Sequence, residues 1–213
     1  MVAPAHSELL DLLSSGAPVS GARLAAKLRI TRAAVWKQIQ ALRHAGLPID
    51  AKAGQGYRLL HAQELLDANE IRRAMPAAAR RRIGMLELHW KLDSTSSELA
   101  RRAGDLPDLG FVFAEMQTAG RGRRGRSWLS PPASNLYFSC LKRFDGGYAS
   151  LSGLSLAAGV AIAQALGDCG VRGIGLKWPN DLVHGDAKLA GILVELGGEF
   201  LGPCHAVIGV GVN

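Results

Sequence analysis

Residues 120–128, GRGRRGRSW, restrict the possible folds of this chain more than any other segment. The four arginines repel one another, and the three glycines let the backbone approach a ligand closely. We therefore expect a loop that becomes ordered on a multiply negative ligand. The Gly-x-Gly-x-x-Gly spacing also matches the dinucleotide fingerprint, but that motif needs a helix directly after the loop. Pro131 and Pro132 follow too soon for such a helix, which argues against a Rossmann fold.

No Walker sequence is present either, because GxxxxGK followed by Ser or Thr does not occur. For the loop on its own, a solvated basic patch or a nonspecific nucleic-acid contact remains the simpler alternative.

The positive charge is concentrated in the first part of the chain. Lys and Arg outnumber Asp and Glu by 13 to 6 in residues 1–82, whereas both number 12 in residues 83–213, so the net charge of +7 arises before residue 83. A basic unit joined to a charge-balanced one predicts a nucleic-acid-binding module attached to a second domain.

Composition also limits location and metal content. No apolar run reaches bilayer length and the N-terminus lacks the order of a signal peptide, so we expect a cytoplasmic protein without a membrane partner. Cys140, Cys169 and Cys204 are far apart and form no CxxC pair, and they are expected to be reduced and buried. Nothing in the sequence predicts a protein-bound structural metal.

Residues 1–62 are predicted to form a winged helix-turn-helix domain. Leucine spacing indicates a short helix ending near Ser14, Ser20 can cap a second helix, and Thr31 can cap a third that extends to about Ala45. The glycine-rich segment that follows predicts a small hairpin, the wing.

The third of these helices has two chemically different sides. Val35, Ile39 and Leu42 make a buried stripe, and the opposite side is polar and basic, as in helices that enter the major groove of DNA. The predicted DNA-binding residues are Thr31, Arg32, Ala33, Trp36, Lys37 and Gln40. A protein-binding three-helix module is the alternative, and an exposed Trp36 would suit it equally.

Residues 63–82 are predicted to be a linker ending in a solvated arginine run, and residues 83–213 an α+β domain with a largely antiparallel sheet. Thr95 and Glu98 suggest a capping box at the start of its first helix. The expected strands are residues 86–90, 111–116, 135–142, 174–178, 181–184, 188–196 and 206–212, and the expected helices are residues 96–103 and 151–166.

Two further motifs in this domain suggest chemistry. KWPND, residues 177–181, places a cation, an aromatic ring, a rigid turn and a carboxylate side by side. KLAGIL, residues 188–193, places a lone lysine in an apolar strand, with Gly191 permitting close approach. By itself, Lys188 is equally a snorkelling edge residue or a functional cation.

Together these motifs resemble biotin–protein ligases. The resemblance rests on DSTSSELA (93–100), QTAGRGRRGRSW (117–128), NLYFS (135–139), KWPNDL (177–182) and KLAGILVE (188–195), and it extends from about residue 7 to the last residue. The N-terminal winged helix makes the chain similar to the bifunctional members, which also repress biotin operons. The implied domain is class II synthetase-like, with a mixed sheet and covering helices. Lipoate–protein ligases share that fold, but the arginine-rich loop favours the biotin branch.

The resemblance implies a two-step reaction. Biotin attacks the α-phosphate of Mg²⁺-bound ATP to give biotinyl-5′-AMP, and a lysine of biotin carboxyl carrier protein then takes the biotin. It implies biotin-binding residues Ser94, Thr95, Ser96, Gln117, Arg121, Gly122, Arg123 and Lys188. It implies nucleotide-binding residues Arg121, Arg123, Trp128, Lys177, Asn180 and Asn213, and catalytic residues Lys188, Arg123 and Asp181. The implied regulation is homodimerisation on biotinyl-5′-AMP, followed by binding to a palindromic operator.

Two departures from the family pattern matter. Ser96 stands where asparagine is common, and the chain ends at Asn213, inside an expected strand. Family members continue to the end of the ligase domain and into an SH3-like barrel, so we expect the 213-residue chain to be an incomplete ligase with impaired turnover. A winged-helix transcription factor that senses a metabolite without turning it over is the alternative function.

Overall fold

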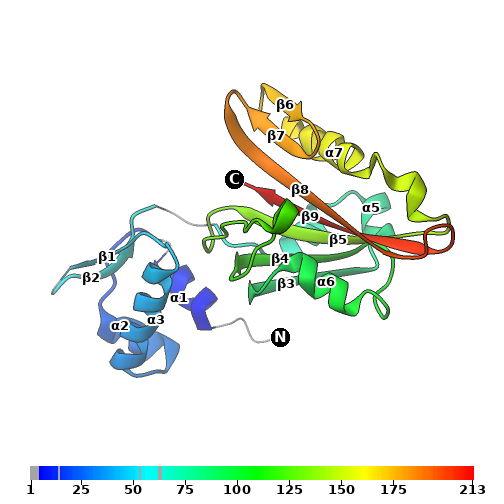
Figure 1. Ribbon diagram of the computed structural model, residues 1–213. Coiled ribbons are helices and arrows are strands. Elements are labelled where there is room, and N and C mark those ends of the chain that lie inside the picture. Colours follow the sequence, from blue (N-terminus) through cyan, green and yellow to red (C-terminus); the bar gives the residue numbers. More distant parts are fainter. Residues whose placement is uncertain (1–4, 14, 53, 62–63) are drawn as a thin grey trace. The chain divides into compact units, whose positions relative to one another are not determined.

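The computed structural model describes residues 5–13, 15–52, 54–61 and 64–213 (Figure 1). Backbone contacts divide the chain into two compact units. The first comprises the residues up to Leu66 with Pro131–Ser134, and the second comprises Asp67–Ser130 with Asn135–Asn213.

The first unit has the element order predicted for a winged helix-turn-helix. Its elements are α1 (Ala5–Leu13), α2 (Gly21–Leu28), α3 (Arg32–His44), β1 (Ile49–Lys52) and β2 (Gly56–Leu59). Both predicted caps are confirmed, since Ser20 Oγ accepts the Arg23 N–H at 3.2 Å and Thr31 Oγ1 accepts the Ala34 N–H at 3.1 Å. The predicted stripe on α3 is fully or almost fully buried, and it packs in a core with leucines of α1 and α2.

Strands β1 and β2 pair antiparallel to form the wing. Tyr57 also exchanges backbone hydrogen bonds with Val19, at 2.8 and 2.9 Å. A Cβ at Gly56 would lie 2.2 Å from the Val19 oxygen, and Gly56 has φ +100°, so this close approach requires glycine.

The second unit is built on a seven-stranded sheet of order β3-β4-β5-β9-β8-β7-β6 (Figure 1). Only β3 and β4 are parallel, which confirms the predicted largely antiparallel sheet. Gly185, with φ +57°, turns the β7–β8 hairpin. The strands are β3 (Met85–Leu92), β4 (Gly110–Gln117), β5 (Leu136–Phe144), β6 (Ile174–Lys177), β7 (Asp181–His184), β8 (Ala187–Gly198) and β9 (Cys204–Val212).

Helices α6 (Thr95–Arg102) and α7 (Leu154–Asp168) cover opposite faces of this sheet. Leu99 of α6 packs with Val207 of β9, whereas α7 packs with Ile208 and Val212 of the same strand. Side chains alternate between faces along a strand, so odd-numbered residues of β9 face α6 and even-numbered ones face α7. The remaining short helices are α4 (Ala68–Ala74), α5 (Ala77–Arg82), η1 (Arg123–Gly125) and η2 (Tyr148–Leu151).

Two expectations need correction. The residue that caps α6 is Ser94, one residue earlier than the predicted capping box, and Glu98 binds Arg101 and Arg102 instead of reaching back to the cap. The arginine run at 80–82 is exposed as expected, and it forms the last turn of α5. Cys140 and Cys204 are buried free thiols, whereas Cys169 is exposed.

Candidate active site and DNA-binding surface

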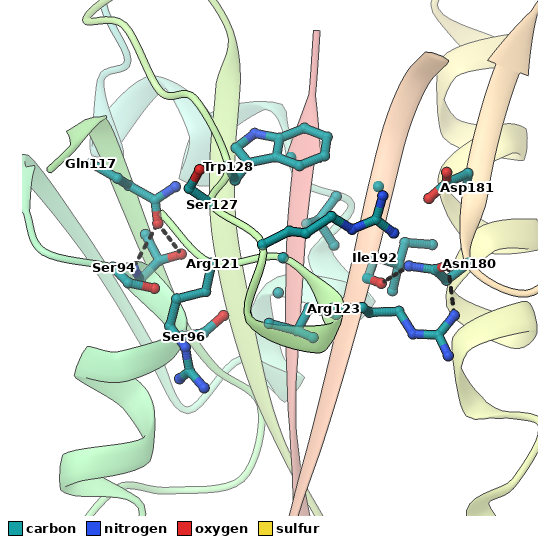
Figure 2. A pocket seen from close by; sticks show the side chains of 18 of the residues that line it. Ser94, Ser96, Gln117, Arg121, Arg123, Ser127, Trp128, Asn180, Asp181 and Ile192 are labelled. Atoms are coloured by element: carbon teal, nitrogen blue, oxygen red, sulfur yellow. Dashed lines mark hydrogen bonds between the residues drawn. The ribbon is translucent and has the colours of Figure 1, made fainter. Parts of the chain in front are cut away.

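A cavity of about 200 Å³ opens in the second unit, between the start of α6, the arginine–glycine loop (residues 120–128) and strands β8 and β9 (Figure 2). All the residues predicted for biotin, nucleotide or catalysis line it, except Lys177 and Asn213. Segments far apart in sequence therefore meet at one site.

The start of α6 forms one wall. Ser94 Oγ accepts the Ser97 N–H at 3.4 Å, which caps the helix and turns the first residues of α6 toward the cavity. Asp93 Oδ1 accepts the Ser94 N–H at 2.7 Å, and Arg101 binds the two Asp93 oxygens at 2.6 and 3.0 Å. These hydrogen bonds, first from Arg101 and then from Ser94, lower the pKa of Asp93 from 3.8 to about 2. The ionised carboxylate thus fixes the turn that presents Ser94.

We expect acid to remove the stabilisation that the contact between Asp93 and Arg101 gives this wall. A carboxyl group with a lowered pKa stabilises the fold above its ordinary pKa, and this stabilisation is lost as pH falls toward 2. Because Asp93 and Arg101 are about half exposed, the loss should be no more than about 1 kcal/mol, or roughly 2–4 °C in Tm. Thermal melts of the wild type and Asp93→Asn between pH 7 and 2 test this, since the wild-type advantage should vanish at the acid end. An equal advantage at every pH would contradict it.

The arginine–glycine loop is a closed hairpin. Trp128 N–H donates to Gly120 O at 2.8 Å and Gly122 N–H to Arg126 O at 2.7 Å. Arg124 and Gly125 take left-handed conformations at the tip, with φ of 56° and 72°. No helix begins in residues 126–135, which agrees with the argument against a Rossmann fold.

Acceptors of the protein itself hold two of the loop arginines. Arg121 forms an ion pair with Glu195 of β8, and Arg123 donates to Asn180 Oδ1 at 3.0 Å (Figure 2). Asn180 in turn donates to Ile192 O of β8 at 2.7 Å, so it connects the loop to the sheet. The loop is thus ordered by specific contacts, although the sequence suggested that only an anionic ligand would order it.

Trp128 closes the cavity over a pair of glycines. Gly191 of β8 and Gly211 of β9 face each other in register, and a Cβ on them would lie 2.7 and 2.5 Å from the Trp128 ring. Lys188 Nζ lies 5.1 Å from the ring centroid and 2.8 Å from Asp181 Oδ1. The ammonium group is therefore held between an aromatic ring and a carboxylate at the cavity, an arrangement that favours a functional cation over a snorkelling side chain.

The two predicted residues outside the cavity have other surroundings. Lys177 is exposed at the end of β6, beside the contact between that strand and α7. The Asn213 side chain donates to Lys188 O at 3.0 Å, so Asn213 lies next to the start of β8. Their predicted nucleotide contacts stay predictions.

Sequence reasoning missed several residues that shape the site. Glu195 and Ser139 lie within quoted motifs, but nothing in the sequence marks them as partners of the loop or of α6. A Cβ at Gly209 would lie 2.3 Å from Ser96 Oγ, which explains why this strand position is glycine. Gly191 was singled out for close approach, and its contact with Trp128 confirms that expectation.

In the first unit, a groove of about 590 Å³ lies between α3 and the wing. Arg32, Ala33 and Trp36 line it from α3, and Lys52 and Tyr57 line it from the wing. The Trp36 side chain is 57% exposed, so it is available to a partner. Of the other predicted DNA-binding residues, Thr31 and Lys37 are exposed beside the groove and Gln40 is half-buried.

Comparison with protein families agrees with both units. Residues 91–213 match the biotin/lipoate A/B protein ligase family, and residues 6–58 match a helix-turn-helix domain. The chain therefore belongs to the biotin/lipoate A/B protein ligase family.

Curated relatives carry both regions. The chain is 42% identical over 205 residues to the bifunctional ligase/repressor BirA of Salmonella typhimurium, covering 96% of this chain and 62% of that protein. It is 32% identical over 212 residues to the protein of the same name from Bacillus subtilis, covering 98% of this chain and 64% of the relative. The chain thus spans less than two thirds of the length of these relatives.

Solved structures of biotin protein ligases match part of this chain. A biotin protein ligase from Aquifex aeolicus in complex with biotin and ATP matches 61% of this chain and 52% of its own, with 32% identity and a TM-score of 0.51. The Leishmania major enzyme in complex with biotin matches 61% of this chain and 56% of its own, with 27% identity and a TM-score of 0.51.

Within the described residues, no helix is long and apolar enough to cross a bilayer. The same residues contain no group of three or more His, Cys, Asp or Glu side chains arranged to hold a metal ion.

Proposed function

We propose that this chain forms biotinyl-5′-AMP from biotin and ATP, transfers biotin to a lysine of biotin carboxyl carrier protein, and represses transcription through its first unit. The observation that carries the proposal is the cavity in the second unit, where hydroxyl and amide groups at one end meet Arg123, Lys188 and Trp128 at the other. The names of the relatives and of the structural neighbours support the same reaction.

The end of the cavity with Ser94 and Gln117 suits the polar ring of biotin, and the end with Arg123 and Lys188 suits the α-phosphate of ATP. In the first step a biotin carboxylate oxygen bonds to the α-phosphorus while the bond to the β-phosphate oxygen breaks and pyrophosphate leaves. Lys188, already held at the cavity, would offset the negative charge that develops between carboxylate and phosphate. Trp128 offers an aromatic face to adenine, and the closed loop would keep water from the mixed anhydride.

Asp181 is the acidic residue that lines this cavity. Magnesium in nucleotide sites is commonly held by one or two carboxylates together with substrate phosphates, so the donor set fits Mg²⁺ that arrives with ATP. Bound there, Mg²⁺ would neutralise phosphate charge. In the second step the neutral amine of the acceptor lysine bonds to the biotinyl carbonyl carbon, the bond from that carbon to the AMP phosphate oxygen breaks, AMP leaves, and the amine loses a proton to solvent. Asp181 and Asn180 would orient that amine.

Incubation with biotin and ATP radiolabelled at the α-phosphate tests the ligase proposal. We expect protein-bound labelled biotinyl-5′-AMP and release of pyrophosphate, followed by labelled AMP release when a carrier domain is added. Binding of biotin and ATP without pyrophosphate release would overturn the ligase activity and favour a sensor without turnover.

The first unit supports DNA binding, and we propose that the protein acts as a repressor in the cytoplasm. Arg32, Trp36 and Lys52 surround the groove between α3 and the wing, which is the surface that a winged helix-turn-helix presents to DNA. We propose that biotinyl-5′-AMP promotes homodimerisation, so that two such units contact the half-sites of an operator.

We expect the double variant Arg32→Gln/Lys37→Gln to lower the salt dependence of DNA binding. Log K falls as log salt rises, with a slope of about −0.9 per phosphate contact, so the magnitude of the slope should decrease by roughly 2 on a duplex of about 30 base pairs. Fluorescence anisotropy across a salt series measures it. The matched control is Arg81→Gln/Arg82→Gln, which removes the same charge from the exposed end of α5 and should leave the slope unchanged. Equal loss in both variants would show that net charge alone drives binding.

A further inference from the structure

A continuous chain of side-chain hydrogen bonds connects the α6 wall of the cavity to Ser139 and Ser130, which do not line it. Ser96 Oγ lies 2.9 Å from Ser139 Oγ, which lies 2.8 Å from Thr95 Oγ1. Thr95 Oγ1 lies 3.2 Å from Gln117 Oε1, and Gln117 Nε2 lies 2.9 Å from Ser130 Oγ. All four hydroxyl-bearing residues are at most 5% exposed, and Ser139 is completely buried.

The backbone fixes the direction of every proton in this chain. The Thr95 N–H lies 2.9 Å from the Gln117 amide and can only donate, so the amide oxygen must face it. The Thr95 hydroxyl faces the same oxygen and must donate to it as well, because two acceptors at 3.2 Å would repel. The Thr95 hydroxyl has then used its one proton, so Thr95 Oγ1 accepts the proton of the Ser139 hydroxyl. Ser139 has in turn used its proton, so Ser139 Oγ accepts the proton of the Ser96 hydroxyl.

Ser96 is therefore committed as a donor to Ser139. Because a hydroxyl has one proton, Ser96 turns only lone pairs toward the cavity that it lines. Ser94 differs, since its oxygen accepts the Ser97 N–H and, among the described residues, its own proton has no acceptor. The wall thus offers a donor at Ser94 and an acceptor at Ser96 (Figure 2).

We propose that Ser139, which does not line the cavity, is a positioning residue that makes Ser96 an acceptor for a ligand N–H. The site then selects a ring that carries an N–H next to a carbonyl, as the ureido ring of biotin does. Gly209 leaves the space in which this chain forms, because a Cβ there would lie 2.3 Å from Ser96 Oγ and 3.4 Å from Ser139 Oγ. The inference rests on the proposed binding of biotin.

Calorimetric titration of biotin and, separately, of ATP into the 213-residue chain tests this role. Ser139→Ala frees the Ser96 proton to rotate, so we expect the Kd for biotin to rise about tenfold while the Kd for ATP stays within about twofold. Ser139→Cys keeps a side chain of similar size with a weak donor, so its Kd for biotin should lie between those of the wild type and Ser139→Ala.

A double-mutant cycle separates positioning from packing. If Ser139 acts through Ser96, adding Ser139→Ala to Ser96→Ala should change the Kd for biotin by less than about twofold. Additive losses, equal losses for ATP, or an unchanged Kd for biotin in both Ser139 variants would overturn the inference. No binding of biotin by the wild type would instead refute the proposed function, and the inference with it.

Discussion

Replacing Lys188 with alanine should reduce biotinyl-5′-AMP formation by about 10²- to 10³-fold, the range found when one preorganised donor to a developing charge is removed. The Lys188 ammonium is held at the cavity by Asp181 and Trp128, so it is in position before the substrates react. Its ion pair is 42% and 25% exposed, so it should contribute no more than about 1 kcal/mol to stability. The rate should therefore fall while Tm changes by only about 2–4 °C.

Single-turnover formation of labelled biotinyl-5′-AMP, measured beside a thermal melt, gives both quantities. Lys91→Ala is the matched control, because Lys91 is an exposed lysine of β3 that does not line the cavity. Its rate should equal that of the wild type. An unchanged rate in Lys188→Ala would refute the charge role, and a large drop in Tm would assign the loss to folding.

Two alanine substitutions on β9 should separate the two ends of the site. Gly209 and Gly211 are two residues apart and point to the same face of the sheet. A Cβ at Gly209 would collide with Ser96, whereas a Cβ at Gly211 would lie 2.5 Å from the rigid Trp128 ring. If the proposed biotin and nucleotide ends are correct, Gly209→Ala should raise the Kd for biotin and Gly211→Ala should raise the Kd for ATP. Each Kd should rise by about 5- to 150-fold, because overpacking costs about 1–3 kcal/mol and 1.4 kcal/mol is tenfold in affinity.

Each variant is the control for the other, since both add one methyl group to the same strand. Calorimetric titrations of biotin and of ATP into each variant give four affinities. Parallel losses of both ligands in both variants would show a general distortion of the sheet, and would refute the division of the cavity into a biotin end and a nucleotide end.

Much of the fold could be predicted because its causes are local. Ser20 and Thr31 cap helices through bonds that span three residues, and Gly185 turns a hairpin between adjacent strands. Prediction from neighbouring residues fails where two similar side chains could each cap the same helix. Thr95 and Ser94 are both good caps, and the choice of Ser94 follows from Thr95, whose hydroxyl and backbone N–H are bonded to Gln117, 22 residues away.

The sequence by itself determined the winged helix-turn-helix, the largely antiparallel sheet and most of the residues that line the cavity, because periodicity, caps and short motifs encode them. Only the tertiary structure decided how those residues are used. The acceptors of the loop arginines, Glu195 and Asn180, come from β8 and the segment before β7, and buried Ser139 connects Thr95 to Ser96 from β5. These pairs are 43 to 74 residues apart, and no local pattern specifies which side chains meet when the strands of a sheet assemble.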